Sequence, residues 1–218
     1  MKKYLLLAAV GFLMLACNEN VPSDPNQGML NGLFSVSDTQ QVHFAQGNLQ
    51  YQPSTNTWRF ATNQYDTIGS ANENRSVTYD GWIDLFGWGT GNNPTYSSNN
   101  LEDYSQFVDW GINPISNGGN KPNLWRTLTI EEWAYLLLER TNADSLCSGG
   151  CVNGVNGMIF LPDNWILPYG VSFSSCASKG FDFCQWMGYQ TGNGIFSYNT
   201  YTEKQWKKWR RMVLCSYL

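Results

Sequence analysis

Apolar and polar residues alternate along the first third of the chain, and this alternation predicts β-strands. Pairs such as Val42 and Phe44 place apolar side chains two residues apart, which is the period of a strand with one buried face. Strand-like segments of this kind cover residues 33–36, 41–45, 49–52 and 57–61. Residues with turn chemistry at 46–48 and 53–56 separate the later segments. The pattern predicts a three-strand antiparallel meander.

A helical pattern begins at Thr129. Thr129 and Glu132 have the spacing of a capping box, in which each side chain accepts a hydrogen bond from a backbone amide at the start of the helix. Leu136 and Leu137 follow on one face, and Arg140 stands near the negative end of the helix dipole. We therefore predict a helix that runs from Thr129 to Arg140.

The remaining segments combine long loops with single elements. Residues 69–123 are dense in Gly, Asn and aromatic residues, and a loop-rich stretch this long inside a domain is often functional. Residues 155–161 are predicted to form a strand. Thr202 and Gln205 repeat the capping-box spacing, which predicts the start of a second helix.

The N-terminus has the pattern of an export signal. Lys2 and Lys3 precede an apolar run over residues 5–16, which is shorter than the about 20 residues that a membrane-spanning helix needs. Residues 13–17 (LMLAC) resemble a lipobox, the motif at which signal peptidase II cleaves before a lipid-modified cysteine.

The resemblance implies a lipoprotein signal peptide over residues 1–16 and a lipid on Cys17. Two or three acyl chains on this cysteine would attach the protein stably to a membrane. The polar residues 17–32 have too little apolar surface to pack, so we expect a flexible, lipidated tether there. An ordinary secreted protein with an incidental Cys17 stays open.

The composition excludes several classes of function. The 218 residues are 15% aromatic and 14% charged with a net charge of −4, which is typical neither of a disordered chain nor of a nucleic-acid-binding protein. The one histidine, His43, rules out a histidine metal cluster and a histidine-based nucleophilic relay. No phosphate-binding glycine loop is present. We predict no metal, no cofactor, no catalytic residue and no nucleic-acid partner.

The cysteines after the lipobox allow disulfides in an exported protein. They are Cys147, Cys151, Cys176, Cys184 and Cys215. Cys147 with Cys151 and Cys176 with Cys184 are candidate local pairs, and Cys215 is then left over. Free buried thiols are the alternative.

Two resemblances point to a known architecture. Residues 125–135 (WRTLTIEEWAY) resemble the WRLPTxxEWEYA signature of formylglycine-generating-enzyme-like domains, which share a variant of the C-type-lectin fold. Residues 42–51, 81–89 and 109–111 resemble a family of Bacteroides-type surface lipoproteins related to the Fibrobacter succinogenes major paralogous domain. The resemblance implies an α+β, C-type-lectin-like domain over residues 33–208, with antiparallel strands, two helices and long loops.

The last ten residues depart from that family. There, the second helix is followed by a Met-Glu-x-x-Gly-Ala-Val-Phe-Leu-Pro strand, whereas this chain has WRRMVLCSYL over residues 209–218. Codons for these residues can be chosen so that a shifted frame reads Met-Glu-Ala-Asp-Gly-Ala-Val-Phe-Leu-Pro. We therefore predict an out-of-frame tail, missing C-terminal strands and marginal stability caused by exposed strand edges. A naturally short variant stays open.

Aromatic side chains on the Asn- and Gly-rich loops are candidate ligand contacts. Such rings stack on the apolar faces of sugars, while Asn, Asp and Gln side chains bind the sugar hydroxyls. The candidates are Trp82, Trp88, Tyr96 and Trp110. The alternative is that these rings fill the core beneath the loops. The calcium and sugar motifs of C-type lectins are missing.

These patterns together predict an exported protein, lipid-anchored in the outer membrane at the cell surface. We expect a non-catalytic binding or adhesion role toward an extracellular glycan or protein. One alternative is an oxidoreductase of the formylglycine-generating type, which needs a cysteine pair in a groove. Another is an inactive product of a truncated gene.

Overall fold

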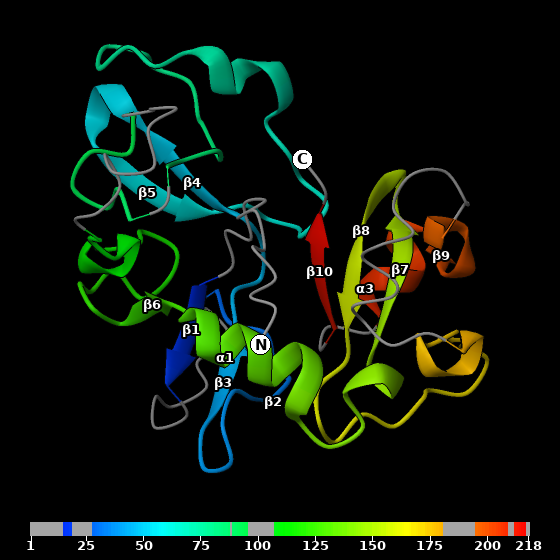
Figure 1. The fold of residues 1–218 in the computed structure, drawn as a ribbon. Helices are drawn as coiled ribbons and strands as arrows, with labels where there is room; N and C mark the ends of the chain where they lie inside the picture. The colour runs from blue at the N-terminus through cyan, green and yellow to red at the C-terminus, as the bar shows by residue number, and fades with distance from the viewer. Residues whose placement is uncertain are drawn as a thin grey trace, which may run out of the picture.

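The computed structural model describes residues 15–18, 28–87, 89–95, 107–180, 195–208 and 212–216 (Figure 1). These residues form a mixed α+β fold with few helices and small, mainly antiparallel sheets, which confirms the predicted α+β class. The helices are short and the loops are many, and the buried side chains form three core clusters.

The described strands make three sheets. They are β1 (Leu15–Asn18), β2 (Phe34–Ser35), β3 (Gln41–Phe44), β4 (Leu49–Gln52), β5 (Thr57–Phe60), β6 (Trp125–Thr127), β7 (Cys147–Val152), β8 (Val155–Phe160), β9 (Thr200–Tyr201) and β10 (Val213–Ser216). The strand orders are β2-β3-β1-β6, β10-β8-β7-β9 and β4-β5. Among these pairings, β7 with β9 is parallel and the others are antiparallel.

The predicted meander is wrong, because β3 and β4 belong to different sheets. Residues 46–48 carry the chain from one sheet to the other instead of closing a hairpin. A Cβ atom on Gly47 would lie 2.4 Å from the carbonyl oxygen of Ala61, so glycine permits a close crossing of two backbone segments. Ala61 then donates its amide to the carbonyl of Asn48 at 2.8 Å.

Both predicted capping boxes are confirmed. Thr129 caps α1 (Ile130–Ala134) with Glu132, and Thr202 caps α3 (Glu203–Lys207) with Gln205. The first helix continues as a π-helical segment over Tyr135–Glu139.

Arg140, directly after this helix, is buried. Its side chain donates to the carbonyl of Leu161 at 3.0 Å and to the carboxylate of Asp163 at 3.0 Å. Asp163 also accepts hydrogen bonds from the amide and hydroxyl of Ser35 and from the side chain of Gln41. This ion pair therefore ties the helix end and the segment after β8 to the β2–β3 hairpin.

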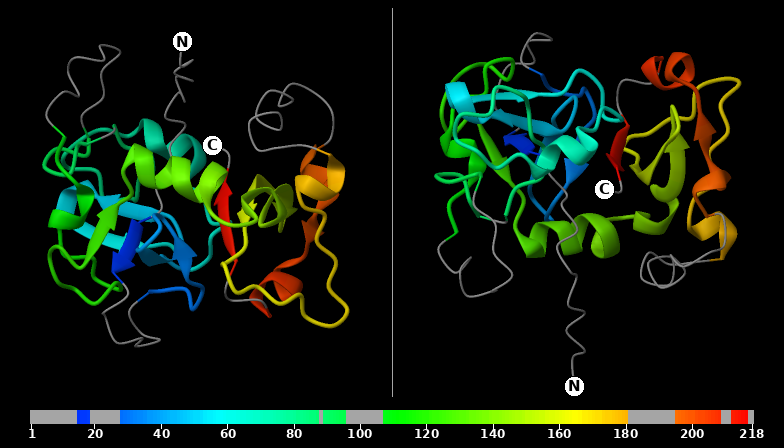
Figure 2. Two further views of the ribbon diagram at one scale, coloured as in Figure 1. Left: turned by 60° about the horizontal axis from the view of Figure 1, so that its bottom comes forward. Right: turned by 90° about the horizontal axis from the view of Figure 1, so that it is seen from above.

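The second sheet is built on a tight hairpin. Asn153 and Gly154 connect β7 to β8 with positive φ angles of 49° and 85°, as a two-residue turn of this kind requires. Strand β10 pairs with the other edge of β8, and both Figure 1 and Figure 2 show it between the two halves of the fold.

The outer edge of β10 is partly covered by one side chain. Gln64 donates to the carbonyl of Met212 at 3.1 Å and accepts from the amide of Leu214 at 2.7 Å. Val213 and Leu214 are fully buried. Residues 212–216 of the expected tail are thus packed, with part of the strand edge satisfied, while the out-of-frame origin of the tail stays a prediction about the coding sequence.

Parts of the expected flexible tether are also paired. Leu30 donates its amide to the carbonyl of Phe44 at 2.8 Å, and Gly28 accepts from the amide of Gln46 at 2.7 Å. The backbone of Cys17 lies in β1, opposite His43 and Trp125. Residues 17–18 and 28–30 thus have backbone partners, while the flexible tether over residues 17–32 stays a prediction.

We predict that Asp163→Asn destabilises the protein by about 3 kcal/mol at pH 7, because it leaves Arg140 as a buried charge without its partner. Burial raises the pKa of Asp163, but hydrogen bonds from Ser35 and Gln41 and the charge of Arg140 outweigh it and lower the pKa. The stabilisation is therefore present above the unfolded-state pKa of about 3.9 and is lost as the pH falls through the lower folded-state pKa.

Chemical denaturation of both proteins between pH 7 and pH 3 measures this effect. The matched control is Asp80→Asn, which changes an exposed carboxylate. A difference between Asp163→Asn and the parent that stays constant down to pH 3 would show that the ionised carboxylate is not the stabilising species.

Candidate functional site

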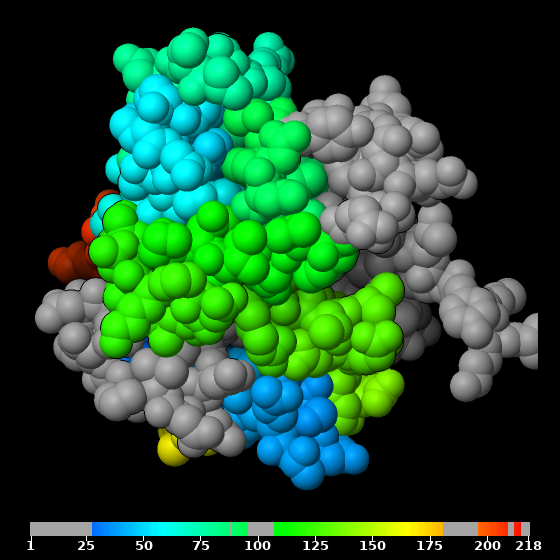
Figure 3. All heavy atoms as spheres, turned by 90° about the vertical axis from the view of Figure 1, so that its left-hand side faces the viewer, coloured from blue at the N-terminus to red at the C-terminus, as the bar shows by residue number. Residues whose placement is uncertain are grey.

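A cavity of about 240 Å³ opens beside the β4–β5 hairpin. Its polar lining consists of Gln50, Arg59, Thr62, Asp66, Thr67 and Asn117. In Figure 3 the cyan atoms of the hairpin lie beside the green atoms of the segment that follows residue 107, on one face of the molecule. The cavity thus lies where the hairpin meets the loops that the sequence marks as functional.

Strand alternation aims Arg59 at this cavity. Trp58 and Phe60 on either side are 2% and 1% exposed, so the intervening side chain lies on the opposite face of the hairpin. Gln50 is the cross-strand partner of Arg59, and its Oε1 accepts a hydrogen bond from Nε of Arg59 at 2.9 Å. This contact holds one edge of the guanidinium group.

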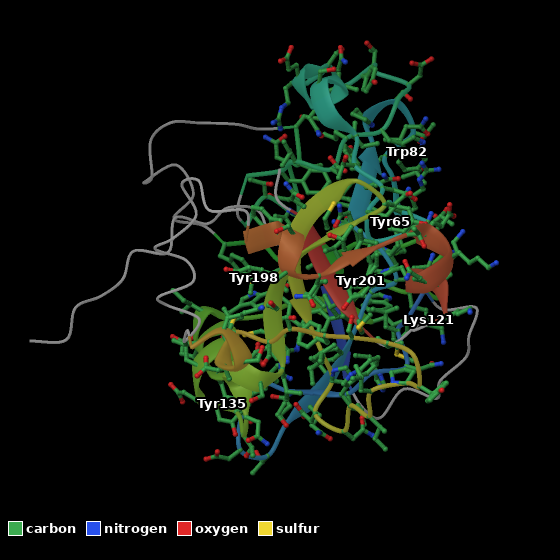
Figure 4. The ribbon with its side chains drawn as sticks, turned by 90° about the vertical axis from the view of Figure 1, so that its right-hand side faces the viewer. Tyr65, Trp82, Lys121, Tyr135, Tyr198 and Tyr201 are labelled. Atoms are coloured by element: carbon green, nitrogen blue, oxygen red, sulfur yellow. The ribbon has the colours of Figure 1, made fainter. Side chains whose placement is uncertain are left out.

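Trp82 holds the face of the same group. Cζ of Arg59 lies 3.7 Å from the centroid of a Trp82 ring, which is a close cation–π contact. Figure 4 shows Trp82 near the ribbon of the hairpin, at the opposite end of the molecule from Tyr135. Two independent contacts therefore orient the arginine.

The guanidinium group keeps free donors. Within the described residues, no carboxylate lies within 4.0 Å of Arg59, and its two Nη atoms have no hydrogen bond. Burial lowers the pKa of Arg59, with no nearby acid to offset the effect. The carboxylate of Asp66, which also lines the cavity, accepts from the amide and the side chain of Asn63 at 2.9 and 3.1 Å.

Two polar side chains make the surroundings rigid. Asn117 accepts from the amide of Phe60 at 2.7 Å and donates to its carbonyl at 2.9 Å, so it pairs with β5 as another strand would. Asp84 is fully buried and accepts from Asn72 at 2.8 Å and from the amide of Ile68 at 3.0 Å. Burial raises the pKa of Asp84. This network secures the loop that carries Trp82.

The four aromatic residues that were predicted to contact a ligand differ in their positions in the structure. Trp82 is half-buried and stacks on Arg59, which lines the cavity, but Trp82 itself is not among the lining residues. Trp110 is 3% exposed and packs against Phe86 in the core, so the prediction of a ligand contact is wrong for this residue. Trp88 and Tyr96 lie outside the described residues.

Sequence reasoning missed Arg59 and Gln50. The signal was present, because Arg59 alternates with two apolar neighbours on a predicted strand. Its cross-strand partner depends on the hairpin register, and its stacking on Trp82 depends on the return of a distant loop.

The structure corrects one of the predicted cysteine pairs, Cys147 with Cys151. Cys147 and Cys151 lie four residues apart on the single strand β7, which separates their Cα atoms by about 13 Å and exceeds the reach of a disulfide. Cys147 instead lies beside Cys176, with the two Sγ atoms 3.7 Å apart and both residues 1% exposed. A hydrogen bond with Cys176, together with burial, raises the pKa of Cys147. Cys184 lies outside the described residues.

The described residues also bear on metal binding and on membrane-spanning helices. Within the described residues, no group of three or more His, Cys, Asp or Glu side chains could hold a metal ion. Nδ1 of His43 lies 2.9 Å from the carbonyl oxygen of Leu30. The described helices are all too short or too polar to cross a membrane.

Comparisons of this chain with protein-family models, with curated proteins and with solved structures found no match. The geometry of the cavity and the sequence motifs are therefore the basis for a functional proposal.

We predict that oxidation joins Cys147 to Cys176. Glutathione disulfide accepts the two electrons and two protons of the thiols and becomes two glutathione molecules, while the Sγ atoms close from 3.7 Å to about 2.05 Å. The cross-link should raise the free energy of unfolding by about 2–4 kcal/mol.

Peptide mapping by mass spectrometry under non-reducing conditions detects the linked peptides. Cys147→Ser should abolish the cross-link, whereas the control Cys151→Ser should retain it. A Cys176–Cys184 peptide in the parent protein would contradict the assignment.

Proposed function

We propose that this chain is an exported, lipid-anchored protein of the outer-membrane surface whose domain binds glycans without catalysing a reaction. The observation that carries the proposal is the cavity beside the β4–β5 hairpin, where an arginine oriented by Trp82, the ring of Phe60 and several amide and hydroxyl groups meet. Apolar ring faces with convergent polar groups suit a sugar, which has an apolar C–H face and a rim of hydroxyls.

The proposal includes a C-type-lectin-like fold for the domain. Its support is the segment that resembles the formylglycine-generating-enzyme signature, which forms β6 and α1 as one locked unit. Arg126 donates to both carboxylate oxygens of Glu132 at 2.6 Å, while Glu132 also accepts from the amide of Thr129 at 2.8 Å. A single carboxylate thus joins strand, turn and helix within the motif.

The oxidoreductase alternative requires an accessible thiol pair. The described candidate, Cys147 with Cys176, is buried in a core cluster with Phe34 and Phe160 and does not line the cavity. Burial and mutual hydrogen bonding raise the pKa of Cys147, which opposes formation of the reactive thiolate. These features favour a structural role for the thiols.

We expect Trp82→Ala to weaken glycan binding about tenfold, because it frees the guanidinium group of Arg59, which lines the cavity. A glycan array followed by calorimetry on the best ligand measures the loss. Trp165→Ala is the control, since Trp165 is also half-buried but packs in a separate core cluster.

Two outcomes would contradict parts of this proposal. Absence of binding by the parent protein to every glycan on the array would favour a protein partner or an inactive product. Equal binding by the parent and Trp82→Ala would exclude the cavity as the site.

The anchor is tested by mass spectrometry of protein made in its native host. We expect a mature N-terminus at lipid-modified Cys17, and Cys17→Ser should abolish both processing and membrane attachment. Cleavage there removes Leu15 and Ala16 and their pairs with Thr127 and Arg126, so Cys17 and Asn18 would be the remainder of β1. An intact Met1 with an unmodified thiol at Cys17 would contradict the anchor.

A further inference from the structure

We propose that Arg59 receives an anionic group, a carboxylate or a sulfate, on the sugar that enters the cavity. This inference rests on the proposed glycan-binding function and names the chemical class of its ligand. Gln50 and Trp82 contact the guanidinium group of Arg59, and its two Nη atoms have no hydrogen bond within the described residues.

The contacts of Arg59 with Gln50 and Trp82 fix the direction of its two Nη groups. Nε is hydrogen-bonded to Gln50, and the planar face lies on Trp82, so the guanidinium group can move little without breaking one contact. The two Nη groups remain, and their parallel N–H bonds match the two oxygens of a carboxylate or sulfate. Preorganisation of this kind reduces the entropy lost on binding.

The charge of Arg59 lacks the ion-pair partner that Arg126 and Arg140 have. Arg126 is paired with Glu132 at 2.6 Å, and Arg140 is paired with Asp163 at 3.0 Å. Arg59 is partly desolvated and has no acid within 4.0 Å among the described residues. An anionic ligand would supply the missing counter-charge.

The remaining lining suits the rest of a monosaccharide. Thr62 and Thr67 are exposed at the cavity and present hydroxyl groups. Asp66 offers a hydrogen-bond acceptor for a sugar hydroxyl and would repel an anion placed beside it, which favours the arginine end for the acidic group. A volume of about 240 Å³ is below the about 300–1,000 Å³ of drug-sized pockets, so it suits one terminal sugar.

Long-range attraction does not assist this recognition, because the chain carries a net charge of −4. Affinity for the anion must come from direct contact with one cation. We therefore expect salt to weaken binding only modestly.

Calorimetry with three oligosaccharides of equal length tests the proposal: galactose, galacturonic acid and sulfated galactose oligomers. The parent protein should bind at least one acidic oligomer about tenfold more tightly than the neutral one. Comparison of the two acidic oligomers then distinguishes a carboxylate from a sulfate.

Variants of Arg59 assign the preference to this side chain. Arg59→Gln should abolish it, so that the acidic and neutral oligomers bind with equal affinity, and Arg59→Lys should retain part of it because the charge remains without the bidentate geometry. Lys121→Gln removes the same charge from an exposed position, away from Trp82 in Figure 4, and should change nothing. Thermal unfolding confirms that each variant is folded.

Each failure has a distinct meaning. If the parent binds the neutral oligomer as tightly as the acidic ones, or if Arg59→Gln keeps the preference, the anionic assignment is wrong and the glycan-binding function stands. If the parent binds none of the three and no glycan on the array, the proposed function is wrong and this inference falls with it.

Discussion

The ion pair between Arg140 and Asp163 is the interaction on which the rest of the fold depends. Arg140 is 3% exposed, and its charge is compatible with burial only because Asp163 and two backbone carbonyls surround it. The same carboxylate binds Ser35 and Gln41, so one residue after β8 sets the position of the first hairpin and of the helix end. Phe34 lies beneath this contact, where the largest core cluster begins.

Polar side chains replace regular sheet partners elsewhere in this loop-rich fold. Gln64 pairs with the edge of β10, Asn117 pairs with β5, and Asn199 donates to the hydroxyl of Ser148 and to the carbonyls of Gly149 and Ser174. Each bonds backbone groups that would otherwise be buried without partners. The cavity beside the hairpin has rigid walls for this reason, because Asn117 and the Asp84 network hold them from behind.

Local chemistry explains which elements could be predicted. Capping boxes at Thr129 and Thr202 lie within four residues of sequence, and the period-two alternation at Val42 and Phe44 reports the buried face of a strand directly. The Asn153-Gly154 turn could also have been predicted, because this dipeptide is a strong hairpin signal. It indicates a strand on each side, and the earlier of the two is β7. The sequence predicted one member of the Arg59–Trp82 contact, because Trp82 was identified as a candidate and Arg59 was not.

By itself, the sequence determined the α+β class and the two helix starts, and its N-terminal pattern predicts an export signal. The tertiary structure decided which strands share a sheet, which cysteine meets Cys147, and whether a tryptophan stacks on Arg59 or lies in the core. The physical reason is the range of the interactions. Caps and strand periods act over a few residues, whereas Trp110 and Trp82 differ only in what distant segments pack against them.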